Sequence, residues 1–186
     1  MPTVAVLGSS LPGEGDPSYE AAREIGRLLA RRAATVLCGG YGGVMEAACR
    51  GAAEAGGDCV GIILAGRGEP NRWVRRPVVV EDLALRLRRL RDDADAWIFL
   101  PHGLGTMLEL GWISESVVKG DVPPRPFVLL GSFWRSTVEA VLSEATGPGK
   151  EALAGCLRWV ETPEEAVALA LGATRSPQLG LPGPKS

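Results

Sequence analysis

The chain has 186 residues, of which 46% are hydrophobic and 23% charged, and its formal net charge is −2. This length suits one domain with a single buried core, and the balanced composition excludes a disordered chain. The small net charge gives no broad attraction to nucleic acid, and no apolar run reaches the roughly 18 to 20 residues of a membrane span. Because the N-terminus enters an apolar run without a basic leader, we expect a cytoplasmic protein with no membrane partner.

The N-terminal region predicts one strand and one helix. Residues 3–7 form a short apolar run that ends in Gly8-Ser9-Ser10, so both serines should lie at the C-terminal end of a buried strand. Residues 17–32 place apolar side chains on one face and arginines toward the end, which is typical of an amphipathic helix.

The second predicted strand leads directly into a glycine-rich turn. Apolar residues 35–38 are followed by Gly39-Gly40-Tyr41-Gly42-Gly43 and by a helical pattern over 44–55. A third apolar run, 59–64, predicts another buried strand. Residues 65–77 are rich in Gly, Pro and Arg without periodicity, so we predict a mobile loop that selects the substrate.

A short strand at 78–80 precedes a helix that begins at Glu81 or Asp82. The leucines of this helix recur at i, i+4 and i+7, and arginines, Arg86 among them, occupy its other faces. Most arginines in this part of the chain are simply explained as a solvated surface.

The central feature of the chain is the motif Pro101-His102-Gly103-Leu104-Gly105-Thr106-Met107-Leu108-Glu109. It follows the apolar run 96–100 and opens a helical pattern over 106–118. A strand, a glycine turn and a helix start in succession leave backbone N–H groups unpaired at the helix N-terminus, where they attract a phosphate or carboxylate. The sequence therefore predicts an anion site at this turn.

Individual residues of the motif have separate expected roles. Gly103 and Gly105 let the backbone approach the anion, and Thr106 caps the helix or donates its hydroxyl. Glu109 lies one turn further along the helix. A carboxylate beside a phosphate site needs a role other than phosphate binding.

The C-terminal region continues the alternation and ends in a tail. Its predicted elements are strands at 127–130 and 157–160 and helices at 134–145 and 163–172. The last helix has the T-x-x-E capping box, Thr162-Pro163-Glu164-Glu165. We assign residues 1–173 to one Rossmann-like nucleotide-phosphate-binding domain and expect the Pro/Gly-rich residues 174–186 to be frayed.

Sulfur-containing residues give no sign of a metal site. The four cysteines are far apart and form no C-x-x-C pair, which argues against a zinc site and a disulfide framework. Met45 and Met107 are most simply core residues. We predict buried thiols at Cys38, Cys49, Cys59 and Cys156.

Short strands that alternate with helices indicate a Rossmann-like α/β fold, a doubly wound parallel sheet with helices on both faces. In that architecture ligands bind outside the carboxyl ends of the strands. Residues 8–10, 39–43 and 101–106 should therefore converge on one crevice.

The motifs resemble those of a known family, the LOG-type, lysine-decarboxylase-like phosphoribohydrolases. The family hallmark P-G-G-x-G-T-x-x-E is similar to residues 101–109, with His102 in place of a glycine. The family's G-S-S opening resembles residues 8–10, and its G-G-G-x-x-G-L-M-G stretch resembles residues 39–46. A helix bearing R-K before an A-D-A strand entry is similar to Arg86-Leu87 before residues 94–96, and the resemblance covers about residues 3–141.

This resemblance implies hydrolysis of the N-glycosidic bond of a nucleoside 5'-monophosphate, with Arg86 and Glu109 as the catalytic pair. Stabilising and hydrating an oxocarbenium-like sugar suits a carboxylate, and no metal or redox cofactor is needed. The resemblance also implies a homodimer, for which Trp112 off the main helical stripe is a candidate contact. Implied phosphate- and nucleotide-binding residues are Ser10, Gly40, Gly42, Gly43, Met45, His102, Gly103, Leu104, Gly105 and Thr106.

Two departures from the family pattern keep other functions open. His102 adds a side chain beside the ligand, where it tunes the pocket or acts as a general acid, and Leu87 replaces the family lysine. The residues around Gly42 look closer to bacterial relatives and to molybdenum-cofactor carrier proteins, which bind a phosphorylated pterin without hydrolysing it. A carrier is thus the alternative; single-stranded DNA binding, a third possibility, is disfavoured by the net charge.

Overall fold

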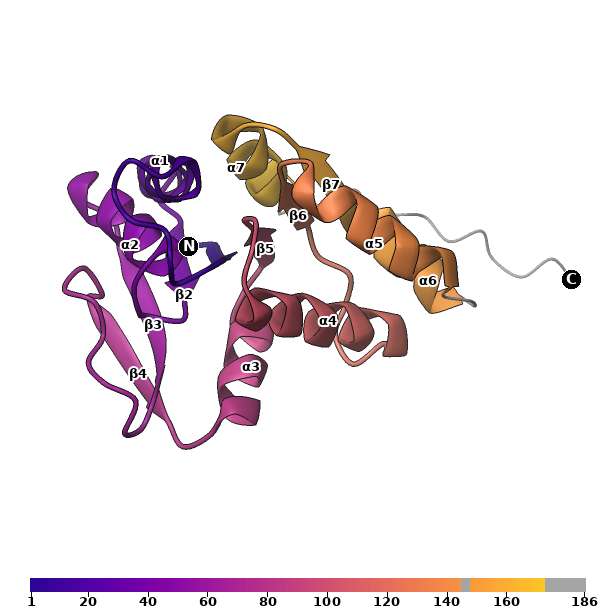
Figure 1. Ribbon diagram of the computed structural model, residues 1–186, viewed down its shortest axis with the longest axis horizontal. Coiled ribbons are helices and arrows are strands. Elements are labelled where there is room, and N and C mark those ends of the chain that lie inside the picture. Colours follow the sequence, from indigo (N-terminus) through magenta and orange to yellow (C-terminus); the bar gives the residue numbers. More distant parts are fainter. Residues whose placement is uncertain (145–147, 173–186) are drawn as a thin grey trace, which may run out of the picture.

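The computed structural model describes residues 1–144 and 148–172, so the expected tail at 174–186 lies outside the described residues. Strands and helices alternate along most of the chain, as predicted, but β4 follows β3 directly and α6 follows α5 (Figure 1). The strands are β1 Thr3–Leu7, β2 Thr35–Cys38, β3 Cys59–Leu64, β4 Arg76–Val80, β5 Ala96–Phe99, β6 Phe127–Leu130 and β7 Leu157–Val160. The helices are α1 Pro17–Arg31, α2 Val44–Glu54, α3 Leu83–Asp92, α4 Leu104–Lys119, α5 Phe133–Glu144, α6 Pro148–Cys156 and α7 Pro163–Gly172.

One parallel sheet of seven strands forms the centre of the molecule, in the order β4-β3-β2-β1-β5-β6-β7. The chain builds the sheet outward from β1 in one direction and then from β5 in the other. Neighbours β1 and β5 are paired from Val4↔Ala96 to Leu7↔Phe99. The order confirms the doubly wound Rossmann-like fold and places its switch point at the C-terminal ends of β1 and β5.

Helices cover both faces of the sheet (Figure 1). Successive strand side chains point to opposite faces, so Val4 and Val6 pack with α1, α2 and α7, whereas Ala5 and Leu7 pack with α3, α4, α5 and α6. Both clusters are built from aliphatic and aromatic side chains that are nearly inaccessible to solvent. This burial on both faces explains why the strands are continuous apolar runs.

Predicted helix caps are confirmed at two helices. The Asp82 side chain accepts a hydrogen bond from the Leu85 N–H at 2.7 Å at the start of α3. At α7, Thr162 Oγ1 accepts from the Glu165 N–H at 3.2 Å, and Glu165 Oε2 accepts from the Thr162 N–H at 3.3 Å. Local sequence therefore determines where these helices begin.

One short helix, α6, was missed. Its first two residues, Pro148 and Gly149, belong to a Gly-Pro-Gly stretch that indicates a turn in the sequence. Tertiary packing favours the helix, since Gly149 lies so close to α4 that an added Cβ would be 2.1 Å from the Val118 carbonyl oxygen. Such close approach requires glycine. In the sequence, however, a glycine beside a proline indicates a loop, and the helix was therefore not predicted.

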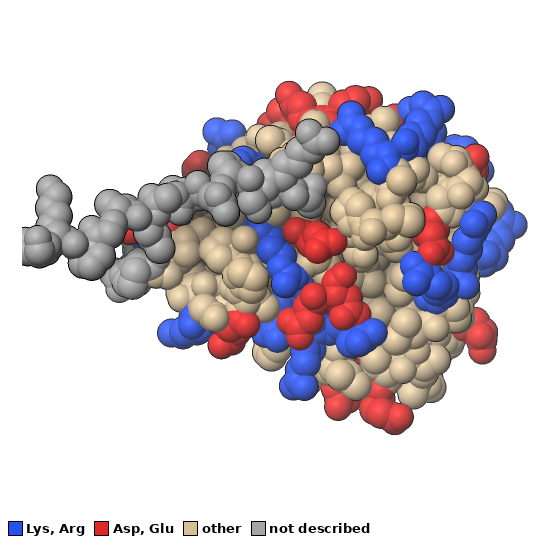
Figure 2. Space-filling view, turned by 180° about the vertical axis from the view of Figure 1, so that it is seen from behind, with Lys and Arg blue, Asp and Glu red and all other residues tan. Residues whose placement is uncertain are grey.

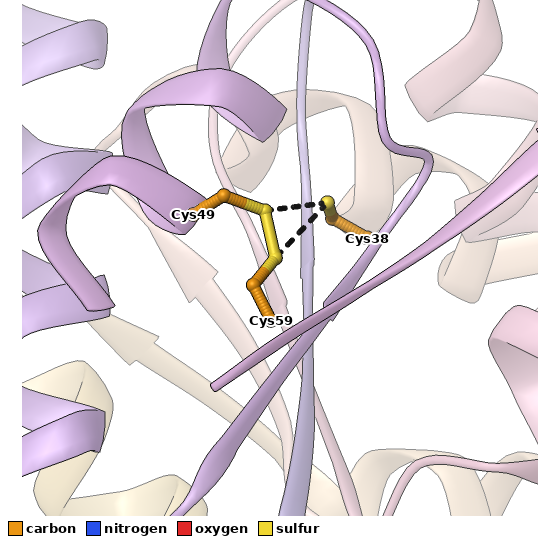
Figure 3. A group of neighbouring side chains, drawn as sticks. All are labelled: Cys38, Cys49 and Cys59. Atoms are coloured by element: carbon orange, nitrogen blue, oxygen red, sulfur yellow. Dashed lines mark hydrogen bonds between the residues drawn. A yellow bond between two sulfur atoms is a disulfide. The ribbon is translucent and has the colours of Figure 1, made fainter. Parts of the chain in front are cut away.

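Two expectations about sulfur-containing side chains are wrong. Cys49 and Cys59 form a disulfide, and only Cys38 and Cys156 are buried free cysteines (Figure 3). The α2 crossover brings Cys49 to the first residue of β3, which the wide sequence spacing did not reveal. Met107 is 40% exposed because it lies on the outer face of α4, whereas Met45 is buried as expected.

Among the described residues, no helix combines the length and the apolar character that crossing a bilayer requires.

Candidate functional site

A cleft of about 660 Å³ opens at the C-terminal edge of the sheet, beside the switch point. It is bordered by the loop after β1, the start of α2, one face of α3 and the first turns of α4. The lining residues are Gly8, Ser9, Ser10, Leu11, Tyr41, Met45, Leu64, Arg67, Leu83, Arg86, Gly103, Leu104, Gly105, Thr106 and Glu109. The three predicted loops therefore converge, although the turn at 39–43 contributes only Tyr41 to the lining.

The N-terminus of α4 faces this cleft without a side-chain cap. Its N-cap is Gly103, with φ 102°, and α4 begins two residues earlier than predicted. Thr106 therefore lies inside the first turn and does not cap the helix, so of its two expected roles only donation of its hydroxyl stays a prediction. Its hydroxyl oxygen is buried and has no hydrogen-bond partner among the described residues. Open backbone N–H groups and an unpartnered hydroxyl form a candidate anion site.

Arg86 and Glu109 meet at the inner end of the cleft. Arg86 Nη1 lies 3.5 Å from Glu109 Oε1, and their side chains are only 11% and 8% exposed. The Arg86 Nε–H also donates to the Ile62 carbonyl at 2.9 Å, which fixes the guanidinium against β3. The structure thus brings together the two residues that the family resemblance implied as a pair.

Burial changes the protonation of Glu109. Loss of solvation raises its pKa to about 7, although the nearby Arg86 charge acts in the opposite direction. The carboxyl group therefore exchanges its proton near neutral pH, as a general acid or base must.

Gly39 was not singled out in the sequence, yet it makes room for Arg86. A Cβ at this position would lie 1.7 Å from Arg86 Nη2 and 2.7 Å from Met45 Sδ. The guanidinium also lies 5.8 Å from the Tyr41 ring centroid, and the Tyr41 hydroxyl accepts a hydrogen bond from the Leu64 N–H at 2.8 Å. The signal in the sequence was a glycine directly after the last residue of β2, where its φ is not positive and so does not itself require glycine.

The other glycines of this turn lie behind the cleft wall and do not line it. Gly40 donates its N–H to Cys38 Sγ at 3.3 Å and accepts from the Asn71 N–H at 2.8 Å. Gly43, with φ 65°, packs against the loop after β1, where a Cβ would be 2.3 Å from the Ser9 carbonyl oxygen. Gly42 approaches the same loop. These residues hold Ser9 and Ser10 in place.

His102 points away from the cleft. It has φ 72°, is exposed, and its ring centroid lies 4.3 Å from that of Phe133 at the start of α5. The residue occupies a backbone conformation that favours glycine, in agreement with the glycine expected from the motif. Leu87, the other departure, is buried in the core.

Residues missed by the sequence analysis complete the cleft at its rim. Arg67 belongs to the predicted selection loop and contributes a positive charge, while Leu11, Leu64 and Leu83 give apolar surface. Asn71 in the same loop donates its side-chain N–H to the Gly40 and Tyr41 carbonyls, at 3.2 and 2.8 Å. The loop is thereby attached to the glycine turn.

Charge on the face shown in Figure 2 is mixed. Acidic and basic side chains alternate there, and the described residues in view form no continuous basic strip.

The chain is similar to several known proteins in sequence and in fold. An uncharacterised protein of Archaeoglobus fulgidus is 31% identical over 108 residues, which cover 58% of this chain and 70% of that protein. A molybdenum cofactor binding protein from Rippkaea orientalis superposes with a TM-score of 0.73 at 24% identity, over 94% of this chain and 98% of the other. The molybdenum cofactor carrier protein of Chlamydomonas reinhardtii gives 0.69 at 26% identity, over 90% and 94%. Residues 1–116 match the sequence model of the SLOG cluster4 family, and the chain therefore belongs to that family.

Proposed function

We propose that the chain binds a phosphorylated small molecule in the cleft and carries it intact, with a phosphorylated pterin of the molybdenum cofactor class as the cargo. One observation carries the proposal: the open N-terminus of α4 presents backbone N–H groups beside the buried, unpartnered Thr106 hydroxyl. Such a site favours a phosphate. The likeness to two proteins described as binding or carrying the molybdenum cofactor supports the choice of ligand.

The rest of the cleft suits the other end of such a ligand. Its volume of about 660 Å³ falls within the range of small-molecule sites, and leucine side chains at the rim can cover a flat ring. At the inner end Arg86 donates hydrogen bonds, and Glu109 accepts them when ionised. A pterin ring offers both kinds of partner.

Calorimetric titration with four probes tests the binding proposal. The probes are inorganic phosphate, guanosine 5'-monophosphate, unphosphorylated guanosine and a pterin bearing a phosphate ester. We expect binding of the phosphorylated probes, strongest for the pterin, and about tenfold weaker binding to Thr106→Val, which removes one hydrogen bond to a charged group. Thr137→Val on α5 is the matched control. Equal binding of guanosine and its monophosphate contradicts the proposal.

Hydrolysis of a nucleoside 5'-monophosphate is the second candidate, favoured by Glu109 with its pKa near 7 beside Arg86. In this reaction the carboxylate takes a proton from a water that attacks the anomeric carbon. The N-glycosidic bond breaks with its electron pair going to the base, the base takes up the proton that Glu109 received, and free base and ribose 5-phosphate leave.

Turnover separates the two functions. Wild-type protein and Glu109→Gln are incubated with nucleoside monophosphates and with the matching nucleosides, and free base is measured by chromatography. Base released only from monophosphates, and lost in Glu109→Gln, establishes the hydrolase and overturns the carrier. Retained binding with no free base supports the carrier.

A further inference from the structure

Three cysteines from separate elements meet in the core beneath the cleft (Figure 3). Cys38 ends β2, Cys49 lies on α2, and Cys59 begins β3. The Cys38 sulfur is 3.4 Å from that of Cys49 and 4.0 Å from that of Cys59, and each side chain is at most 1% exposed. A disulfide joins Cys49 to Cys59, so the cluster holds one disulfide and one thiol.

We propose that, once this disulfide is reduced, the three sulfurs bind one soft monovalent metal ion of the Cu(I) class. A dithiol reductant supplies the two electrons and two protons that convert the disulfide into two thiols, and the reductant becomes a disulfide. The three thiols then release three protons as three metal–sulfur bonds form. The metal keeps its oxidation state throughout.

The number and type of ligands favour this metal class. The three sulfur atoms lie within 4.8 Å of one another, and no histidine or carboxylate of the described residues completes the group. Structural zinc requires four ligands, whereas soft thiolates select Cu(I). The cluster lies among buried aliphatic side chains of α2 and the sheet, which excludes water as a fourth ligand.

Burial raises the pKa of the Cys38 thiol to about 12, so its proton leaves only as the metal–sulfur bond forms. The Gly40 N–H donates to its Sγ at 3.3 Å, which fixes the sulfur at the position where it faces the other two. The fourth cysteine, Cys156, is buried on α6 on the opposite face of the sheet. It provides a control that has the same chemistry outside the cluster.

The test uses the full chain, reduced anaerobically with a phosphine and freed of reductant. Cu(I) is added in competition with a chromophoric Cu(I) chelator, and X-ray absorption identifies the donor atoms. We expect one Cu(I) per chain, bound by sulfur only. Cys38→Ser and Cys59→Ser should each weaken Cu(I) binding by at least about 10- to 100-fold. Mutating a residue that only hydrogen-bonds to a metal ligand already costs this much, and loss of a ligand itself should cost no less. Cys156→Ser should bind as the wild type does, and far-ultraviolet circular dichroism verifies that each variant folds.

Two further measurements separate this site from general thiol chemistry. Thiol counting in denaturant should give two thiols in the oxidised chain and four after reduction, and the oxidised chain should bind Cu(I) no better than the folded Cys59→Ser variant. Zn(II) should not displace Cu(I). Equal binding by wild type and Cys38→Ser, or nitrogen or oxygen donors around the metal, overturns the proposal.

Discussion

The two glycine-rich turns of the molecule have similar sequences and opposite environments. Both join a parallel strand to a helix at the same edge of the sheet, after β2 and after β5. At the first turn the Val44 N–H donates to the Ser9 carbonyl at 2.9 Å, and Gly43 packs against the same loop. At the second, an added Cβ on Gly105 would meet no atom within 4 Å, and Thr106 has an unpartnered hydroxyl. One turn builds the cleft wall, and the other presents open polar groups to the cleft.

The helices after these two turns also differ in how far they are buried. Seven of the eleven residues of α2 are buried, whereas α4 exposes an apolar stripe that consists of Leu104, Met107, Leu108 and Trp112. A glycine-rich turn therefore does not define a ligand site by itself. What decides is whether the polar groups at the helix start already have partners within the protein.

The largest expected effect comes from adding a methyl group to each turn. Gly43→Ala should lower the free energy of unfolding by at least about 3 kcal/mol, because its Cβ overlaps the Ser9–Ser10 backbone at a positive φ. Gly105→Ala should change it by less than about 1 kcal/mol but weaken phosphate binding, since its side chain enters the cleft. Urea denaturation and calorimetry measure both quantities. Similar stability losses in the two variants would contradict the assignment of the first turn to structure and the second to binding.

The pH dependence of stability tests the burial of Glu109 behind the open turn. Its pKa is about 7 in the folded chain and near 4.5 when exposed, so between these values the folded state holds a proton that the unfolded state has lost. The free energy of unfolding should therefore fall as pH rises, by about 2–3 kcal/mol between pH 5 and pH 8. Glu109→Gln should lack this component in urea denaturation across the range. Parallel profiles for both proteins would mean that the carboxyl group is well solvated.

The exposed stripe on α4 predicts self-association, which α2 cannot support because it is covered. We expect a homodimer, and Trp112→Glu should weaken it by about 2 kcal/mol, as loss of a central aromatic contact does. Sedimentation equilibrium at micromolar concentration measures this. Glu115→Gln, on the same helix and ion-paired with Lys119, is the control. A wild-type protein that is monomeric under these conditions rules out the dimer.

Gly39→Ala tests whether the first turn affects binding indirectly. The three atoms nearest to the added Cβ are side-chain atoms, two of the Arg86 guanidinium and Met45 Sδ, so the guanidinium should shift from its position beside Ile62 while the fold persists. Binding of the phosphorylated pterin should weaken about tenfold, or about 1.4 kcal/mol, which corresponds to one lost charge-assisted hydrogen bond. Gly42→Ala should bind normally, since its Cβ would make an ordinary 3.5 Å contact with the Ser10 carbonyl oxygen. Equal effects in both variants would show that Arg86 is not the cause.

Sequence predicted the features that depend on neighbouring residues. The strand, turn and helix around Gly103 are local, and so are the caps at Asp82 and Thr162, which is why they were found. Features that depend on separate elements were not found. The role of Gly39 depends on Arg86 reaching across from α3, and the sulfur cluster depends on the α2 crossover that returns Cys49 to Cys59.

The smallest expected effect concerns His102, the residue that distinguishes the second turn from the family pattern. His102→Gly relieves the strain of a positive φ, which stabilises the fold by about 1 kcal/mol. It also loses the ring contact with Phe133, which destabilises the fold by about the same amount. The free energy of unfolding should therefore change by less than about 1 kcal/mol. Phe133→Leu, which removes the contact but keeps the strain, should be the less stable variant in urea denaturation. Because the imidazole points toward α5, phosphate binding in His102→Gly should match that of the wild type. A binding or turnover defect in His102→Gly would instead place the imidazole in the cleft. There it could donate a proton to the leaving group, which would support the hydrolase function over the carrier function.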